Sequence, residues 1–142
     1  MNASGDPNSN LSSLAILLAE DNPVNQKVAT RVLKLLGYQA DVVNNGQEVI
    51  KAIAEKVYDL ILMDVQMPEI DGIEATQYIR NQEAESQSQP ITIIAMTANA
   101  TDDDQILCRN AGMTDYMSKP IQIDKLKLML YHYGAKKNKS HN

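Results

Sequence analysis

Runs of apolar residues alternate along the chain with segments of mixed apolar and polar character. Four runs, at residues 14–19, 59–63, 91–96 and 115–117, are each followed by polar or charged side chains. Near-continuous apolar runs of this length are typical of strands buried on both faces, as in parallel sheets. Together with a further short segment at 40–43, they predict five strands.

The segment after residues 20–21 has the start and stop signals of a helix. Asn22 is a favourable N-cap, Pro23 suits the first helical position, and Gly37 favours the end. Spacings of three and four residues predict that the buried face of this helix consists of Val24, Val28, Val32 and Leu35.

Four further helices are predicted between and after the strands. They begin near Gly46, after Gly72, near Asp102, and after Pro120, and Gly112 should end the third of them. Residues 83–89 are predicted to be a polar connector. The inward-facing residues are expected to be Val49, Ile50 and Ile53, then Ala75 and Ile79, and finally Ile123, Leu126, Met129 and Leu130.

Five strands that alternate with five helices predict an α/β fold. Right-handed crossovers place helices on both faces of a parallel sheet, which gives a doubly wound (βα)5 three-layer sandwich. One domain is expected over residues 14–134. The Asn-, Ser-, Gly- and Pro-rich residues 1–13 are predicted to be a flexible leader, and residues 135–142 a polar tail.

Composition and charge argue against several classes of protein. The chain has 142 residues and a net charge of −5, which argues against a nucleic-acid partner. Its apolar runs are too short to span a membrane, and no signal peptide is visible at Met1. The single cysteine, Cys108, fits a reducing compartment and predicts a cytoplasmic location.

Three carboxylates are predicted to converge at one edge of the sheet. Glu20, Asp21 and Asp64 follow the ends of two predicted strands, and ligands of open parallel sheets bind beyond the carboxyl ends of the strands. Clustered carboxylates favour a hard cation such as Mg²⁺, and the backbone carbonyl of Gln66 can supply a further oxygen. For each acid alone, helix capping or simple exposure is an equally good interpretation.

The same edge should carry the parts needed for phosphoryl transfer. A carboxylate such as Asp64 can act as a nucleophile and form an aspartyl-phosphate. Lys119, the hydroxyl of Thr97 and the backbone N–H of Ala98 can hold phosphoryl oxygens. Taken singly, Lys119 would be interpreted as a surface lysine and Thr97 as an ordinary strand residue. Because His132 and His141 are the only histidines, a histidine donor is expected to belong to another chain or domain.

Four motifs in this order resemble the receiver domain of two-component response regulators, from about Leu14 to Tyr133. They are Leu-Leu-Ala-Glu20-Asp21-Asn-Pro-Val-Asn, Met-Asp64-Val-Gln-Met-Pro-Glu-Ile-Asp-Gly72, Met-Thr97-Ala-Asn-Ala and Tyr116-Met-Ser-Lys119-Pro120. The resemblance implies a flavodoxin-like sheet with strand order 2-1-3-4-5. It also implies a cis bond between Lys119 and Pro120.

The resemblance implies a role for each matching residue. Asp64 would accept a phosphoryl group from a partner phosphohistidine, and Glu20, Asp21, Asp64 and the Gln66 carbonyl would hold Mg²⁺. Lys119 and Thr97 would bind phosphoryl oxygens, and Tyr116, otherwise a core aromatic, would be the switch residue that responds to Thr97. Gln66 and Asn99 would influence how fast the phosphate is lost.

The residues of the first and third motifs are most similar to those in receivers of hybrid sensor histidine kinases. The implied partners are a histidine kinase, a histidine phosphotransfer protein, or both, and a weak homodimer is compatible with this assignment. The domain would support its own Mg²⁺-dependent phosphorylation and dephosphorylation without being a turnover enzyme. No output domain is visible after the last helix. The chain would then be a module of a hybrid kinase that passes phosphate to a histidine phosphotransfer protein, and a stand-alone receiver that switches a protein-interaction surface is the second interpretation.

Two other classes remain as alternatives. A Mg²⁺-dependent phosphatase with an aspartate nucleophile requires a second acid two residues on, where this chain has Gln66. An interaction module that is never phosphorylated has the same sequence signature, and a failure to bind Mg²⁺ would favour it.

Overall fold

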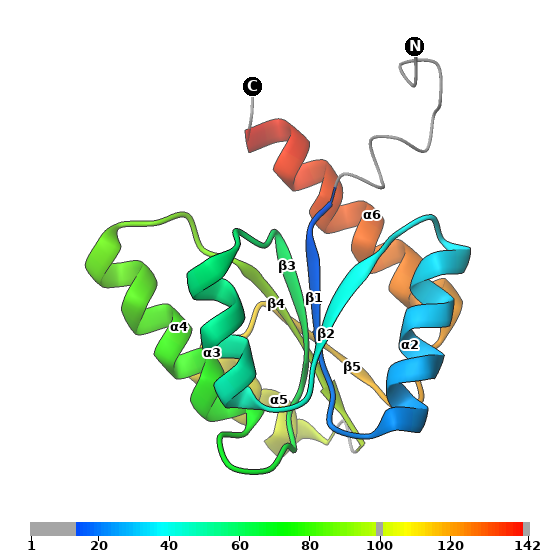
Figure 1. Cartoon of the computed structure of the whole chain (residues 1–142), viewed down its shortest axis with the longest axis horizontal. Helices are drawn as coiled ribbons and strands as arrows, with labels where there is room; N and C mark the ends of the chain where they lie inside the picture. The colour runs from blue at the N-terminus through cyan, green and yellow to red at the C-terminus, as the bar shows by residue number, and fades with distance from the viewer. Residues whose placement is uncertain (1–13, 99–100, 141–142) are drawn as a thin grey trace.

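A computed structural model describes residues 14–98 and 101–140, with side chains as far as Gly134 (Figure 1). Five parallel strands form one sheet in the order β2-β1-β3-β4-β5, which confirms the predicted fold and strand order. The strands are β1 (Ile16–Ala19), β2 (Ala40–Val43), β3 (Leu60–Asp64), β4 (Thr92–Thr97) and β5 (Asp115–Ser118).

Helices cover both faces of the sheet, as the alternation along the chain predicts. They are α2 (Pro23–Leu35), α3 (Gly46–Glu55), α4 (Gly72–Ser86), α5 (Asp102–Ala111) and α6 (Ile123–Ser140). Figure 1 shows α2 and α6 on one side of the sheet and α3 and α4 on the other. The result is the predicted three-layer sandwich.

Alternate strand residues build two separate cores, because successive side chains of a strand point to opposite faces. On one face, Ile16, Leu18, Leu60 and Leu62 pack with residues of α2 and α6. On the other, the intervening residues of the same strands pack with α3, α4 and α5. The central strands are therefore buried on both faces, which explains their apolar runs.

Most of the predicted helix boundaries are confirmed. The side chain of Asn22 accepts hydrogen bonds from the backbone N–H groups of Val24 and Asn25, and Pro23 is the first residue of α2. Gly112 ends α5 with a φ of 105°, a left-handed conformation that favours glycine.

The predicted buried face of α2 is wrong. Val24, Val28 and Leu35 are 67%, 42% and 71% exposed, whereas Ala29 and Leu33 are buried. The small side chain of Ala29 lets the helix approach the sheet closely, and Val32 is only partly buried beside it. The prediction selected the larger apolar residues and thereby rotated the helix away from its true orientation.

Three smaller differences concern the other helices. Ile123 is 41% exposed, although Leu126 and Leu130 are buried as predicted. The helix α4 continues to Ser86, so the connector predicted from residue 83 begins later; Glu83 lies within the helix and forms an ion pair with Arg80. The helix α6 continues to Ser140, past the residue where the polar tail was expected to start.

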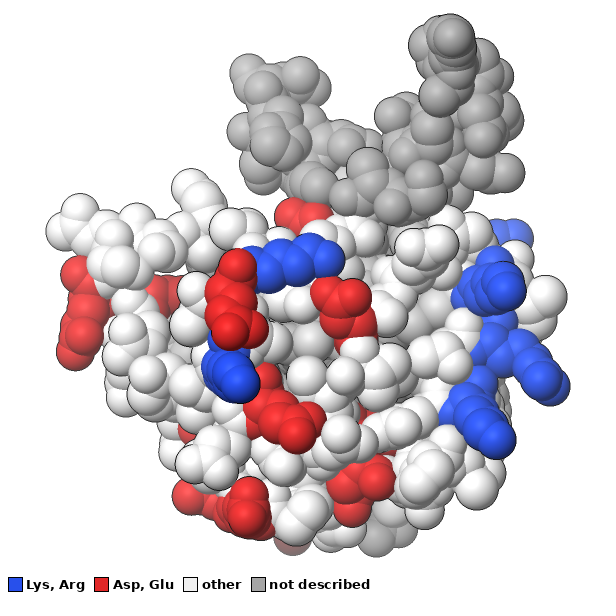
Figure 2. Space-filling view, in the orientation of Figure 1, with Lys and Arg blue, Asp and Glu red and all other residues white. Residues whose placement is uncertain are grey.

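Charge is unevenly distributed over the surface. The helix α2 contains Lys27, Arg31 and Lys34 and no acidic residue. Figure 2 shows Lys and Arg side chains gathered on the side of the molecule where α2 lies, while acidic side chains, with some basic ones among them, are spread over the rest of this view. Within the described residues, no helix is long and apolar enough to cross a membrane.

Candidate functional site

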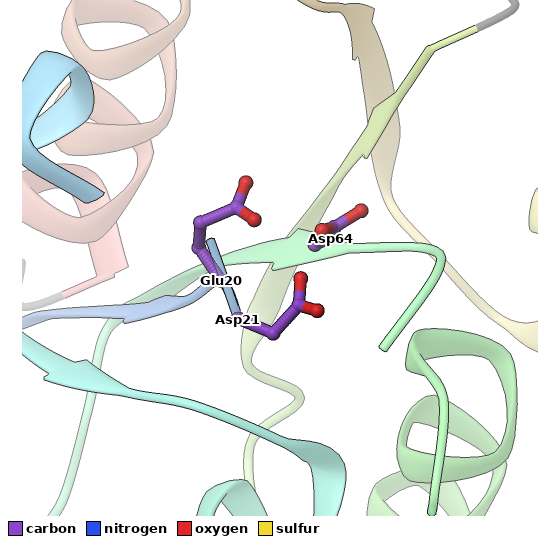
Figure 3. Close-up of side chains that lie close together, drawn as sticks. All are labelled: Glu20, Asp21 and Asp64. Carbon is purple, nitrogen blue, oxygen red and sulfur yellow. The ribbon is translucent and has the colours of Figure 1, made fainter. Parts of the chain in front are cut away.

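The carboxyl ends of β1 and β3 bring three acidic side chains together. Asp64 is the last residue of β3, while Glu20 and Asp21 follow directly after β1, its neighbour in the sheet. Figure 3 shows the three carboxyl groups gathered around one space at these strand ends. This is the convergence that the sequence predicts.

The three carboxylates form a set of oxygen donors that fits a hard divalent cation. One oxygen from each of Glu20, Asp21 and Asp64 lies within 4.8 Å of the others. Glu20 and Asp64 are only 2% and 3% exposed, whereas Asp21 is exposed. Two buried carboxylates and a third at the surface match the carboxylate-and-water coordination that Mg²⁺ prefers.

Lys119 reaches into this acidic cluster from beyond β5. Its Nζ atom lies 2.9 Å from Oδ2 of Asp64 and 3.1 Å from Oε1 of Glu20. Burial lowers the pKa of the Lys119 ammonium, but hydrogen bonds and charge from Asp64 and Glu20 outweigh it, so the pKa is raised overall. The bond between Lys119 and Pro120 is cis, as expected.

Backbone donors orient the two buried carboxylates. The N–H of Asn22 donates to Oε2 of Glu20 over 3.1 Å, and the N–H of Gln66 donates to Oδ1 of Asp64 over 3.1 Å. Gln66 also lines the cleft that contains the three carboxylates. Each buried carboxylate therefore has one oxygen held by the backbone and the other paired with Lys119, and the metal-binding role of the Gln66 carbonyl stays a prediction.

Thr97 is the last residue of β4, the strand that pairs with β3, which ends in Asp64. Asp64 is paired with Met96 in the register of β3 and β4, and the N–H of Lys119 donates to the carbonyl of Thr97 over 2.8 Å. The threonine is 8% exposed, and Ala98 after it is exposed. The structure thus places Thr97 and Lys119 beside Asp64, while the phosphate-binding roles of Thr97 and Ala98 remain predictions.

Tyr116 lies on β5 and is partly buried against the core formed with α3, α4 and α5. The Nζ atom of Lys125 sits 5.8 Å from the centroid of its ring. Its proposed response to Thr97 is a prediction that needs a second state of the molecule. Asn99, the other variable position singled out from the sequence, lies outside the described residues.

Two glycines allow the loops around the acidic cluster to pack tightly. A Cβ atom at Gly72 would collide with the carbonyl oxygen of Asp64, and one at Gly46 would collide with the carbonyl oxygen of Ile70. The N–H groups of these glycines donate to Val65 and Ile70, respectively. Any larger residue at Gly72 would therefore displace the backbone that carries Asp64.

The cleft also includes residues that sequence reasoning did not assign to it. Asn25 and Asp71 line it together with Met67 and Pro68. Asp71 caps α4 by accepting a hydrogen bond from the N–H of Glu74. In the sequence, Asp71 is marked only by its position just before Gly72, where a helix is predicted to begin. That position predicts a helix cap and gives no indication that Asp71 lines a cleft.

Comparison with known proteins identifies relatives over most of the chain. The sequence model for the response regulator receiver domain matches residues 16–131. A probable histidine kinase 1 of Oryza sativa subsp. indica is 40% identical over 83% of this chain. A histidine protein kinase 1 of Candida albicans is 42% identical over 94% of it. The chain spans only 15% and 6% of these two relatives.

Solved structures agree with this assignment. The receiver domain of the sensor histidine kinase PA1611 from Pseudomonas aeruginosa, with a magnesium ion in its active-site cleft, is 41% identical with a TM-score of 0.76. That match covers 86% of this chain and 98% of the other. A chain in the co-crystal structure of the Saccharomyces cerevisiae phosphotransfer protein Ypd1 and the receiver domain of Ssk1 has 30% identity and a TM-score of 0.83. That match covers 87% and 90% of the two chains.

Sequence, fold and site thus point the same way. The family model covers most of the chain, the sheet has the order that the family's motifs implied, and the acids lie with Lys119 at the carboxyl edge. The chain belongs to the response regulator receiver domain family.

Proposed function

We propose that Asp64 accepts a phosphoryl group from a phosphohistidine of a partner protein. The observation that carries this proposal is the position of Asp64: a carboxylate that is 3% exposed lies 2.9 Å from the Lys119 ammonium, within a cluster of three acids. A buried carboxylate paired with a cation at the edge of an open cleft has the position that a nucleophile for phosphoryl transfer requires.

The residues of the cleft would divide the work of the transfer. A carboxylate oxygen of Asp64 forms a bond to phosphorus while the phosphorus–nitrogen bond of the donor breaks, and the electron pair returns to the imidazole. The Lys119 ammonium pairs with one phosphoryl oxygen, and the Thr97 hydroxyl and the Ala98 N–H donate to others. Glu20, Asp21, Asp64 and the Gln66 carbonyl would hold Mg²⁺, which offsets negative charge in the cleft when bound.

The comparisons support particular classes of partner. The curated relatives described above are named as histidine kinases, and the Ssk1 receiver domain was crystallised with a histidine phosphotransfer protein. We therefore propose a histidine kinase or a histidine phosphotransfer protein as the source or the destination of the phosphoryl group. The domain would catalyse its own phosphorylation and dephosphorylation at Asp64 without turning over a separate substrate.

Phosphorylation would also change the surface of the domain. The added group brings roughly −1.5 to −2 charges and new acceptor oxygens. Lys119 and Thr97 would move toward it, and Tyr116 would follow Thr97. The surface around α5, β5 and α6 would then differ between the two phosphorylation states.

Intact mass measurement after incubation with Mg²⁺ and a small phosphodonor such as acetyl phosphate tests the proposal directly. We expect one added phosphoryl group on the natural sequence, and none on Asp64→Asn or after chelation of Mg²⁺. Retention of the added mass in Asp64→Asn would place the acceptor elsewhere. If no group is added even by a purified phosphohistidine protein, the alternative of an interaction module that is not phosphorylated would be supported.

A further inference from the structure

The side chain of Gln26 makes two short hydrogen bonds next to the acidic cluster. Its Nε2 atom donates to the backbone carbonyl oxygen of Glu20 over 2.6 Å and to Oδ1 of Asn44 over 2.7 Å. We infer that Gln26 is a positioning residue that holds the Glu20–Asp21 turn in the geometry needed to bind a divalent cation. This inference rests on the cation site included in the proposed function.

The position of Gln26 in α2 explains why its side chain reaches the turn. Its N–H makes the first intrahelical hydrogen bond, to the carbonyl of Asn22 over 2.9 Å. Helical side chains lean toward the N-terminus of the helix, so a long side chain in the first turn extends back past the cap. The side chain of Gln26 is therefore long enough to reach the Glu20 carbonyl just after β1, where the chain turns through Asp21 into α2.

The Glu20 carbonyl needs such a donor because the sheet ends beside it. The N–H of Glu20 still bonds to the carbonyl of Val43, the last residue of β2, over 3.1 Å. Beyond Val43 the chain turns into α3, so β2 supplies no further backbone N–H group that could donate to the Glu20 carbonyl. A buried backbone carbonyl without a partner is costly, and the Gln26 amide satisfies it.

Asn44 and Glu48 fix the other end of this contact. The Glu48 carboxylate accepts from the N–H of Asn44 over 2.7 Å and from its Nδ2 over 3.2 Å. With Nδ2 directed to Glu48, Oδ1 of Asn44 is left to accept from Gln26. Glu48 is itself fixed at the start of α3, where its N–H donates to the Asn45 side chain over 2.8 Å.

These contacts tie the turn between β1 and α2 to the loop between β2 and α3. The turn carries two of the three carboxylates, and Glu20 and Asp21 can bind one cation with Asp64 only if their spacing is kept. Partners that orient metal ligands typically contribute 10- to 100-fold in metal affinity. Loss of the Gln26 donor should therefore weaken cation binding without removing any ligand.

Titration of the full chain with Mg²⁺ at constant ionic strength, followed by amide NMR shifts, tests this role. Gln26→Met keeps the length of the side chain and removes its donor, and we expect about a tenfold higher Kd. Asn44→Ala should raise the Kd in the same direction. Gln47→Met, the same change at an exposed residue of α3, should leave the Kd within about twofold of the natural value.

A second control separates positioning from general stability. Leu33→Ala removes a buried contact of α2 and leaves the Gln26 contacts in place, so it should lower the melting temperature but not change the Kd. If Gln26→Met binds Mg²⁺ as tightly as the natural sequence, or if Leu33→Ala weakens binding equally, the positioning role is refuted. If the natural sequence binds no Mg²⁺, the cation site of the proposed function fails first, and the inference fails with it.

Discussion

The ammonium nitrogen of Lys119 lies 2.9 Å from Oδ2 of Asp64 and bridges it to Glu20 at 3.1 Å. One cationic side chain is thus shared by the two buried members of the acidic cluster. Lys119 offsets their repulsion, and at the same time it competes with any divalent cation for the same oxygens.

Replacement of Lys119 should therefore have opposite effects on two measurements. In Lys119→Met, a positive charge about 3 Å from two ligands is removed. Repulsion between two charges at such a distance costs ~1 kcal/mol even at the dielectric constant of water, so Mg²⁺ should bind about fivefold more tightly or better. Phosphorylation by a small donor should fall at least about tenfold, because the phosphoryl oxygens lose a cation. Weaker Mg²⁺ binding in this variant would show that Lys119 supports the metal site instead of competing with it.

The orientation of α2 predicts a large difference between two leucines separated by two positions. Leu33 is 1% exposed and Leu35 is 71% exposed. Leu33→Ala should reduce the free energy of unfolding by about 2–5 kcal/mol, whereas Leu35→Ala should change it by no more than about 0.5 kcal/mol. Urea denaturation monitored by circular dichroism measures both, and equal losses would contradict the orientation of the helix.

Gly72 should tolerate no side chain, because a Cβ atom would meet the carbonyl oxygen of Asp64 and the Cα of Val65. We expect Gly72→Ala to reduce the free energy of unfolding by about 1–3 kcal/mol and to impair phosphorylation of Asp64. Gly134→Ala is the matched control, since no atom lies within 4 Å of a Cβ there and alanine favours a helix. A Gly72→Ala protein with natural stability and phosphorylation would show that the β3 end can move freely.

Two tyrosines should make stability depend on alkaline pH. Burial and the hydrogen bond to Asp41 raise the pKa of Tyr58 to about 12, and burial and Asp115 do the same for Tyr133. Because the folded state holds these protons more tightly than the unfolded state, the stabilisation is complete below pH 10 and is lost as the pH rises through about 12.

Absorbance at 295 nm, which follows tyrosinate, measures this titration, and urea denaturation measures the free energy of unfolding. Tyr58→Phe should remove one high-pH transition and reduce the free energy of unfolding at pH 8 by about 1 kcal/mol, since Asp41 is partly solvated and its hydrogen bond is correspondingly weak. Tyr78→Phe, at a residue that is 42% exposed, is the control. A Tyr58 transition near pH 10 would indicate that the contact with Asp41 is not stable in solution.

The acidic cluster was predictable because a general rule of topology applies to it. Parallel strands end at one edge, so polar residues that follow apolar runs must meet there, and Glu20, Asp64 and Lys119 do so. The strand order required the family resemblance, since hydrophobic periodicity contains no information about which strands are neighbours.

The errors in α2 and the missed role of Gln26 have a common physical cause. The sequence of α2 has apolar residues on more than one side, and the small Ala29, not the larger Val24 or Val28, contacts the sheet. Gln26 acts through Asn44, 18 residues away in the chain, and this contact exists only after β1 and β2 pair. Local periodicity cannot reveal a contact that depends on the assembled sheet.

The positions of the start of β1 and the end of α6 relative to the acidic cleft have a practical consequence. The start of β1 and the last turns of α6 lie at the edge of the sheet opposite the carboxylates (Figure 1). A tether joined at either of these two points would therefore leave the cleft open to an incoming protein. The domain can be immobilised or fused at the start of β1 or the end of α6 for kinetic experiments, and the acidic cleft would stay accessible from the solvent.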